Sequence, residues 1–249
     1  LRAVLDALDL QDVAVAGFSM GGAVTVRYMS RHGGARISQL ALLGAAVPCF
    51  TRRPDFPCGL EKSAVDDLIR QCYADRPAMV AGFGKIFFNQ PVSDQIRAWF
   101  NDLGFEASGH ATAMTAVEHR DADPRPDLAA IHVPTLILHA VHDQVCRYEL
   151  AEAMHAGIKG SHLVPFDCGG QRILLRGKGP LQRRATALPG PSARAVYSRE
   201  RRSRISAARA RVVSSASGSS ASWLASSSAP KHSTSSITRT SRSRPAPTP

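Results

Sequence analysis

The stretch Asp12-Val-Ala-Val-Ala-Gly-Phe-Ser-Met-Gly-Gly22 decides the fold, because its hydrophobic pattern changes in the middle. Val13 to Ala16 form a short apolar run, which is typical of a parallel strand covered on both faces. The residues after Ser19 follow the period of a helix instead. We therefore expect a buried strand that turns sharply into a helix, with Ser19 at the turn.

Gly17-Phe-Ser-Met-Gly21 fits the pattern G-x-S-x-G, in which a serine occupies a strained strand-to-helix turn. We expect glycine to be needed at Gly17 and Gly21 because a side chain there would collide with the neighbouring strand or helix. The turn would lift the Ser19 hydroxyl out of the sheet and place the Met20 N–H at a helix N-terminus, where it can hold an oxyanion. The alternative is a glycine-rich turn with an idle serine. The strand before, the helix after and a further glycine at Gly22 favour a nucleophile.

The segments around this turn predict an α/β fold with a parallel sheet. The helix after Ser19 is expected to end near His32-Gly33-Gly34, and Gln39 to Gly44 form a second buried strand. Strand, helix and strand make a parallel βαβ unit with a right-handed crossover. Four further elements are expected: an opening helix over residues 1–10, a strand Val133–His139, a helix over 148–156 and a strand Leu163–Phe166.

Residues 47–127 separate the second strand from the third and are helical, with proline between the helices. One of these helices is expected to begin after Ser93 and to end at Gly104. Helices inserted into an α/β sheet can cover the carboxyl ends of the strands, where ligands bind. We interpret residues 47–127 as a helical lid, with a plain structural insertion as the alternative. His110 and His119 within it are interpreted as solvated or packed side chains.

Charge divides the chain into two unlike parts. Residues 1–170 carry 15 Lys and Arg against 19 Asp and Glu, whereas residues 171–249 carry 16 against a single acid, Glu200. The net charge of +11 therefore comes from the second part. Residues 171–249 are rich in Ser, Arg, Ala and Pro and have no apolar period, so they cannot bury enough surface to offset their chain entropy. We expect a folded part over 1–170 and a disordered basic tail over 171–249.

The five cysteines form an odd, scattered set without a Cys-x-x-Cys pattern, which indicates neither a disulfide framework nor a zinc site. No stretch approaches the about 20 apolar residues of a membrane span, and no signal-peptide pattern opens the chain. These features predict a cytoplasmic protein without a membrane partner, and we expect no metal and no cofactor. The first residue is Leu1 rather than Met, so we expect the sequence to continue upstream.

Residues 1–170 resemble the second half of an α/β-hydrolase, in particular of the cofactor-free haloperoxidase and arylesterase branch. The resemblance rests on the G-x-S-x-G stretch, on the Val133–His139 strand followed by Asp143-Gln-Val, and on the chain order serine, helical lid, acid. It implies a partial α/β-hydrolase fold and small carboxylic esters as substrates. It also implies that Ser19 is the nucleophile and that Asp143 orients a histidine.

Two departures from the family pattern surround the acid. Ala140-Val141-His142 stands where the family usually has Gly-Asp-x, and Cys146 stands where a proline is common. Neither departure removes the carboxylate. His142 beside Asp143 suggests a metal site, but two neighbouring loop residues lack a third ligand at useful spacing, so we interpret His142 as a loop residue.

The departure that decides activity is a missing histidine. In the family a histidine follows the last strand in a Gly-His setting, whereas here Gly169-Gly170 is followed by Gln171. His162 precedes that strand and therefore lies at the wrong end of the sheet. A serine hydroxyl without a base is a weak nucleophile at neutral pH, so we expect this chain to be inactive.

A frameshift accounts for both the missing histidine and the basic tail. Synonymous codons for Gln171 to Pro189 can be chosen so that a shift of one base encodes an amphipathic helix with family character. Restoring that frame with a histidine codon before it then places a histidine directly after Gly170. We interpret residues 171–249 as out-of-frame sequence from a GC-rich gene.

The function that we expect for the intact enzyme is hydrolysis of small carboxylic esters by a Ser-His-Asp triad. Within the family, perhydrolysis of short carboxylic acids with peroxide is the alternative. An alternative of another class is a basic protein that binds nucleic acid through its Lys/Arg-rich tail. Only Tyr197 and Trp223 in the tail offer stacking, so a nucleic-acid partner is not favoured. The sequence leaves the oligomeric state open.

Overall fold

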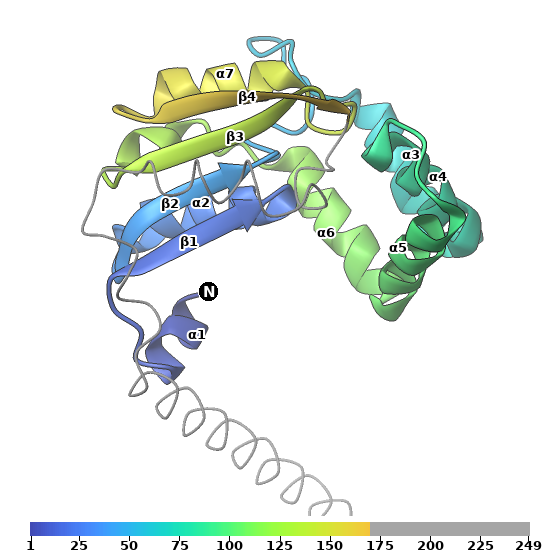
Figure 1. The fold of residues 1–249 in the computed structure, drawn as a ribbon, viewed down its shortest axis with the longest axis horizontal. Coiled ribbons are helices and arrows are strands. Elements are labelled where there is room, and N and C mark those ends of the chain that lie inside the picture. Colours follow the sequence, from blue (N-terminus) through green and yellow to red (C-terminus); the bar gives the residue numbers. More distant parts are fainter. Residues whose placement is uncertain (170–249) are drawn as a thin grey trace, which may run out of the picture. The chain divides into compact units, whose positions relative to one another are not determined.

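The computed structural model describes residues 1–169. Within them a parallel sheet of four strands has the order β1-β2-β3-β4 (Figure 1). The strands are β1 (Val13–Phe18), β2 (Ile37–Leu43), β3 (Thr135–His142) and β4 (His162–Gly169). All four run in the same direction, so their carboxyl ends meet at one edge of the sheet, the edge at which ligands bind in α/β folds. The predicted α/β class and parallel sheet are confirmed.

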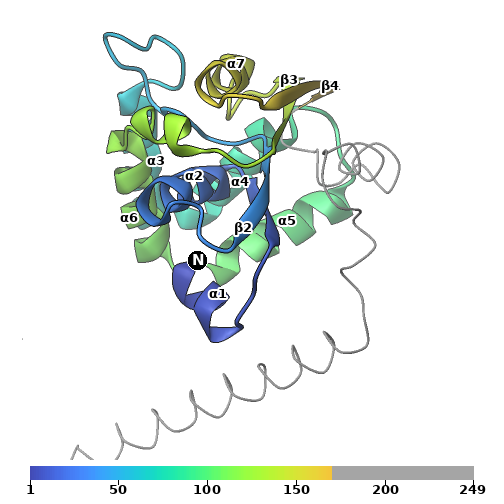
Figure 2. The same cartoon turned by 90° about the vertical axis from the view of Figure 1, so that its left-hand side faces the viewer.

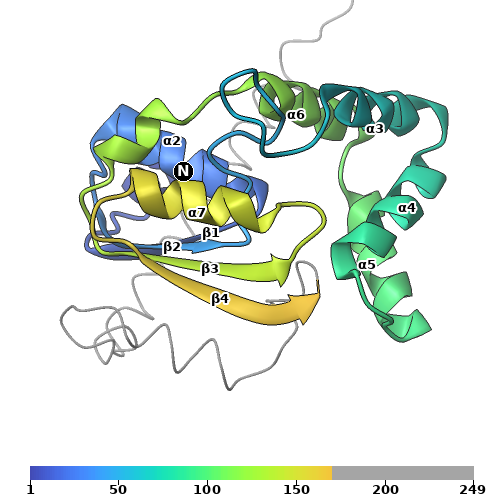
Figure 3. The same cartoon turned by 90° about the horizontal axis from the view of Figure 1, so that it is seen from above.

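Two helices cover one face of this sheet. They are α2 (Met20–His32), which follows β1, and α7 (Tyr148–Gly157), which follows β3 (Figure 3). The core between them and the sheet is fully buried and includes Leu40 and Ile137 of the strands, Val26 of α2 and Met154 of α7. Gly33 ends α2 with a φ of 59°, a left-handed conformation that glycine adopts without strain. The predicted glycine stop after this helix is therefore confirmed.

Strand β3 is buried on both faces, which explains its run of apolar residues from Leu136 to Leu138. Ile137 contributes to the core beneath α2 and α7, whereas Leu136 and Leu138 point to the other face and pack with Phe18 and Leu43. A parallel strand with neighbours on both sides and side chains buried above and below reads as a continuous hydrophobic run. The burial of β3 fixes the position from which the loop over residues 143–147, called the acid loop below, leaves the sheet.

Two short helices pack near the sheet. Helix α1 (Arg2–Ala7) lies at the β1 side of the sheet, opposite β4 (Figures 1 and 2). Its Asp6 carboxylate is 3.1 Å from Nε of Arg36, which precedes β2. The 3-10 helix η1 (Pro126–Ala130) brings the chain back to β3, and its Leu128 joins the core beneath α2.

Four helices lie between β2 and β3 in sequence and beyond the carboxyl ends of the strands in space (Figures 1 and 3). They are α3 (Lys62–Ala74), α4 (Arg76–Phe88), α5 (Asp94–Glu106) and α6 (Gly109–Asp121). The Ser93 hydroxyl accepts the N–H of Ile96 at 3.3 Å, and the Ser108 hydroxyl accepts that of Ala111 at 3.2 Å. Each serine therefore caps the helix that follows it.

The prediction that α5 ends at Gly104 is wrong, because the helix continues to Glu106. A Cβ built on Gly104 would lie 2.8 Å from Cγ1 of Val80 in α4. Glycine at this position therefore allows two helices to approach each other closely, and it does not terminate the helix.

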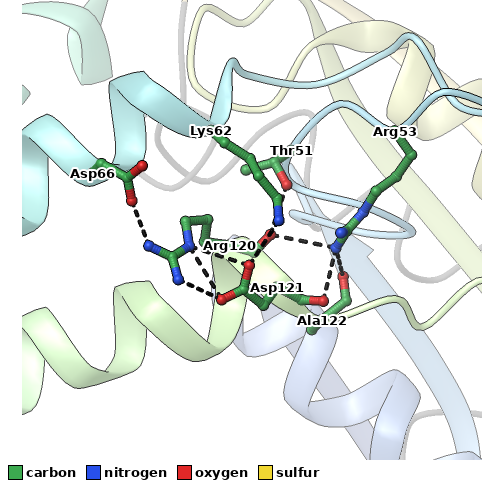
Figure 4. Close-up of polar contacts among 7 residues, drawn as sticks. All are labelled: Thr51, Arg53, Lys62, Asp66, Arg120, Asp121 and Ala122. Carbon is green, nitrogen blue, oxygen red and sulfur yellow. Dashed lines mark hydrogen bonds and ion pairs between the residues drawn. The ribbon is translucent and has the colours of Figure 1, made fainter.

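A group of polar contacts joins the end of α6 to the segment after β2 (Figure 4). The Thr51 hydroxyl donates to the Arg120 carbonyl at 2.6 Å, and the Arg53 guanidinium donates to the carbonyls of Asp121 and Ala122 at 2.8 and 3.0 Å. The last carbonyls of a helix lack partners within the helix, so these donors satisfy them. Arg120 also pairs with Asp66 of α3, which ties α3 to α6.

The interpretation of residues 171–249 as a disordered, out-of-frame tail falls outside the described residues and stays a prediction. Within residues 1–169, no helix is both long and apolar enough to cross a bilayer.

Candidate active site

Ser19 occupies the sharp turn between β1 and α2, where the motif placed it. Its backbone has φ 50° and ψ −123°, a conformation that is unfavourable for a residue with a side chain. Three backbone hydrogen bonds hold it there: the Ser19 N–H donates to Leu43 at 3.0 Å, and its carbonyl accepts from Gly22 at 2.9 Å and from Ala46 at 3.0 Å. Met20 is the first residue of α2, so its N–H has no partner within the helix and can face an oxyanion.

The two motif glycines differ in what surrounds them. A Cβ on Gly17 would lie 2.8 Å from both Gly22 Cα and Thr25 Oγ1. The collision predicted at Gly17 is therefore found. For Gly21 the expected collision is not found, because no described atom lies within 4 Å of such a Cβ. The crowded position is Gly22 instead, whose Cβ would lie 2.4 Å from that of Ala45 after β2. Close helix-to-strand packing therefore depends on Gly17 and Gly22.

Gly22→Ala should lower the free energy of unfolding by about 2–3 kcal/mol, the usual cost of overpacking a tight core site. The matched control is Gly21→Ala, which adds the same methyl group in open space within the same helical turn. It should be neutral or stabilising by up to about 1 kcal/mol, because alanine favours helix. Urea unfolding followed by circular dichroism measures both variants. Equal effects of the two would contradict this account of Gly22.

Asp143 directly follows β3 and is 5% exposed. Its Oδ1 accepts the N–H groups of Val145 and Cys146, both at 2.8 Å. The carboxylate is therefore held by backbone groups of the loop that it begins. Both donors are backbone groups, which orient the carboxylate without depending on a flexible side chain. The departures from the family pattern at positions 140–142 and 146 thus leave a well-held acid.

His139 also holds the acid loop, a role that the sequence analysis missed. It is fully buried in β3, and its Nε2 lies 2.6 Å from the Cys146 carbonyl. Burial lowers the pKa of His139 more than this hydrogen bond raises it, so the ring stays neutral and Nε2–H donates. The only signal in the sequence was a histidine at the end of an otherwise apolar strand.

Ser19 and Asp143 lie at the same edge of the sheet, at the carboxyl ends of β1 and β3. Strand β2 lies between them, so two strand spacings separate the two ends by about 10 Å. An imidazole between the two side chains would bridge this span. Strand β4 pairs with β3 as far as Gly169 opposite His142, so β4 ends beside the acid loop. A histidine placed directly after Gly170 would follow that end.

Within residues 1–169, no histidine is hydrogen-bonded to the Ser19 hydroxyl. His142 is the last residue of β3 and not a loop residue as predicted, and its exposed ring lies 3.7 Å from the Asp167 carboxylate. His162 opens β4 at the opposite end of the sheet. The two histidines of α6 have other neighbours. Nδ1 of His110 lies 3.1 Å from the Tyr73 hydroxyl, and the ring centroids of His119 and Phe50 are 4.6 Å apart.

His119 should make the fold sensitive to acid. Burial lowers its pKa to about 4, and its Nε2 has no hydrogen-bond partner among the described residues. Between pH 6.5 and pH 4 the unfolded chain binds a proton that the folded chain does not, so the free energy of unfolding decreases as the pH falls. The decrease from this group reaches up to about 3 kcal/mol and is complete below about pH 4. His119→Phe keeps a ring against Phe50 and should lack this loss. Urea unfolding of the parent and of His119→Phe at pH 4.5 and pH 7 tests this prediction. An equal pH dependence of the free energy of unfolding in the two proteins would contradict it.

Aromatic side chains of helices α4 and α5 reach the residue next to Ser19. The ring of Phe18, which precedes Ser19, meets Phe87 of α4 edge to face at 6.3 Å between centroids. Phe87 in turn lies 4.5 Å from Phe100 of α5. The helices α4 and α5 thus present an apolar aromatic wall beside the serine turn.

Within the described residues, no group of three or more His, Cys, Asp or Glu side chains is arranged to hold a metal ion. The arrangement that the residues do provide is a serine at a strained turn, an N–H at a helix N-terminus and a buried acid at the same sheet edge. Such a set suits nucleophilic attack on a carbonyl once a base is present.

Comparison with curated proteins finds relatives over about two thirds of this chain. The AB hydrolase superfamily protein YisY of Bacillus subtilis is 48% identical over 166 residues, which make up 67% of this chain and 62% of that protein. A putative non-heme chloroperoxidase of Synechocystis is 33% identical over 172 residues, 66% of this chain and 61% of its own length. No family model matches the chain.

Solved structures give the same result. An esterase (EaEST) from Exiguobacterium antarcticum matches with a TM-score of 0.68 at 43% identity, over 70% of this chain and 65% of that one. A bromoperoxidase from Bacillus anthracis matches with a TM-score of 0.66 at 30% identity, over 68% of this chain and 64% of that one. The chain therefore spans less than two thirds of the length of each of these four proteins.

Proposed function

Because the relatives of this chain belong to the AB hydrolase and non-heme haloperoxidase families and its fold is a partial α/β-hydrolase fold, we propose that its site is that of a serine hydrolase for small carboxylic esters. The observation that carries the proposal is Ser19 in the strained turn between β1 and α2, with the buried acid Asp143 at the same sheet edge. The substrate would be a small molecule, and we propose a cytoplasmic location.

Each residue would have one role in the reaction. Ser19 would attack the ester carbonyl while a histidine takes the serine proton and later returns it to the leaving alcohol. Asp143 would orient that histidine and stabilise its positive form. The Met20 N–H would supply half of the oxyanion hole, since it lies at the start of α2 beside the nucleophile.

The base would be a histidine that we expect to be missing from this chain. Histidine follows the last strand in the family that the chain resembles, and Gln171 stands there instead. We propose that a frameshift directly after the Gly170 codon removes this histidine and that the present chain is inactive for this reason. Sequencing genomic DNA across this position tests the frameshift directly.

Hydrolysis of p-nitrophenyl acetate by a chain with the base restored tests the function. The frame-restored protein should hydrolyse the ester, and Ser19→Ala should abolish that activity. The aromatic wall beside Ser19 supports an ester with an apolar acyl or alcohol part. A restored, folded protein without Ser19-dependent hydrolysis of any ester would refute the proposal.

Perhydrolysis is the second candidate, and the names of the relatives favour it. A bifunctional esterase/perhydrolase, DCH, of Acinetobacter calcoaceticus is 29% identical over 175 residues, and a bromoperoxidase is among the structural matches. The same serine would then pass its acyl group to hydrogen peroxide and release a peracid. Halogenation that requires acetate, peroxide and Ser19 together would identify this activity. Ester hydrolysis without such halogenation would exclude perhydrolysis and support the esterase function.

A further inference from the structure

Asn89 ends α4 and reaches across to the acid loop. Its backbone is left-handed, with a φ of 48°, and its N–H donates to the Lys85 carbonyl, so it serves as the C-cap of the helix. Asparagine is among the few residues with a side chain that adopt this conformation readily. The Asn89 side-chain amide donates to the His142 carbonyl at 2.7 Å. One residue thus joins the lid to the end of β3.

The His142 carbonyl belongs to the residue directly before Asp143. The acid loop is held from within by the two N–H bonds to the Asp143 carboxylate. It is also held by the hydrogen bond between His139 of β3 and the Cys146 carbonyl. On the lid side, it is held by Asn89. The carbonyl that Asn89 holds belongs to the peptide unit that joins His142 to Asp143. A shift of this peptide unit would therefore reorient the Asp143 carboxylate.

The last turn of α4 touches both halves of the candidate site. Phe87 packs against Phe18, directly before the nucleophile, and Asn89 holds His142, directly before the acid. The two contacts lie two residues apart on one helix end. A movement of this turn would therefore change the surroundings of Ser19 and of Asp143 together.

We propose that Asn89 is a positioning residue for Asp143, through which the lid helix α4 holds the acid loop in place. The catalytic meaning of this link rests on the proposed role of Asp143, whereas the link itself does not. Asn89 touches no reacting atom and acts through the His142 peptide unit.

Amide hydrogen exchange of the full chain, without substrate, tests the link. Asn89→Gly keeps the left-handed cap and removes the side-chain donor, and Asn89→Asp keeps the size of the side chain but cannot donate. In both variants the amides of Val145 and Cys146 should exchange roughly two- to ten-fold faster, the change expected from loss of one hydrogen bond. The α4 amides of residues 79–88 should keep their exchange rates in Asn89→Gly.

The matched control is Ser108→Ala, which removes a capping bond elsewhere in the lid, at the start of α6. It should leave the amides of Val145 and Cys146 unchanged. Unchanged exchange of these two amides in both Asn89 variants would overturn the proposal. So would equal acceleration in α4 and in the acid loop, because Asn89 would then act only as a helix cap. Neither readout depends on ester hydrolysis, so failure of the proposed function is a separate result.

Discussion

Ser19→Ala should leave the hydrolysis of p-nitrophenyl acetate by the present chain unchanged. The Ser19 hydroxyl has no hydrogen-bonded histidine within residues 1–169, and a serine without a base is a weak nucleophile at neutral pH. Any acceleration over buffer would then come from binding and from oxyanion contacts, which persist in the variant. Initial rates at equal concentrations of the two folded proteins measure this.

The same substitution should have a very large effect once the histidine is restored. The comparison uses a gene in which the family-like frame is restored after the Gly170 codon, so that a histidine codon follows it directly, and which is extended upstream to the length of the relatives. In that protein, Ser19→Ala should lower kcat by as much as about six orders of magnitude, as should replacement of the restored histidine, because triad members act as a unit. Ser19-dependent turnover by the unrestored chain would show that another histidine serves as the base.

Asp143→Asn in the restored protein should lower kcat by roughly four orders of magnitude while the fold is kept. The oxygen of asparagine can still accept the Val145 and Cys146 N–H groups that now bond to Oδ1, so the acid loop should survive. The lost negative charge would no longer fix the histidine tautomer or stabilise its positive form.

The control for this substitution is Asp143→Ala, which also removes the acceptor of the two N–H groups. It should lower the free energy of unfolding by about 1–3 kcal/mol, because two buried donors lose their partner. The Asn variant should unfold within about 1 kcal/mol of the parent. An unchanged kcat in folded Asp143→Asn would assign the orienting acid to another residue.

The sequence pattern alone predicted the parallel sheet and the turn at Ser19. These features depend on hydrophobic period and on glycine and serine signals, all of which act between residues close in the chain. Ser93 illustrates this, since the residue that caps α5 lies three positions from the N–H that it accepts. The Val13–Phe18 strand and the helix after it are local in the same sense.

Only the tertiary structure decided which glycines are crowded and which side chains hold the acid. Gly22 meets Ala45, Gly104 meets Val80, and Asn89 bonds to the His142 carbonyl, each a contact between residues 23 to 53 positions apart. No periodicity within one segment records such a contact, because it depends on how two segments pack. Gly21 and Gly22 are neighbours with the same side chain, and only the approach of the chain after β2 makes one of them indispensable.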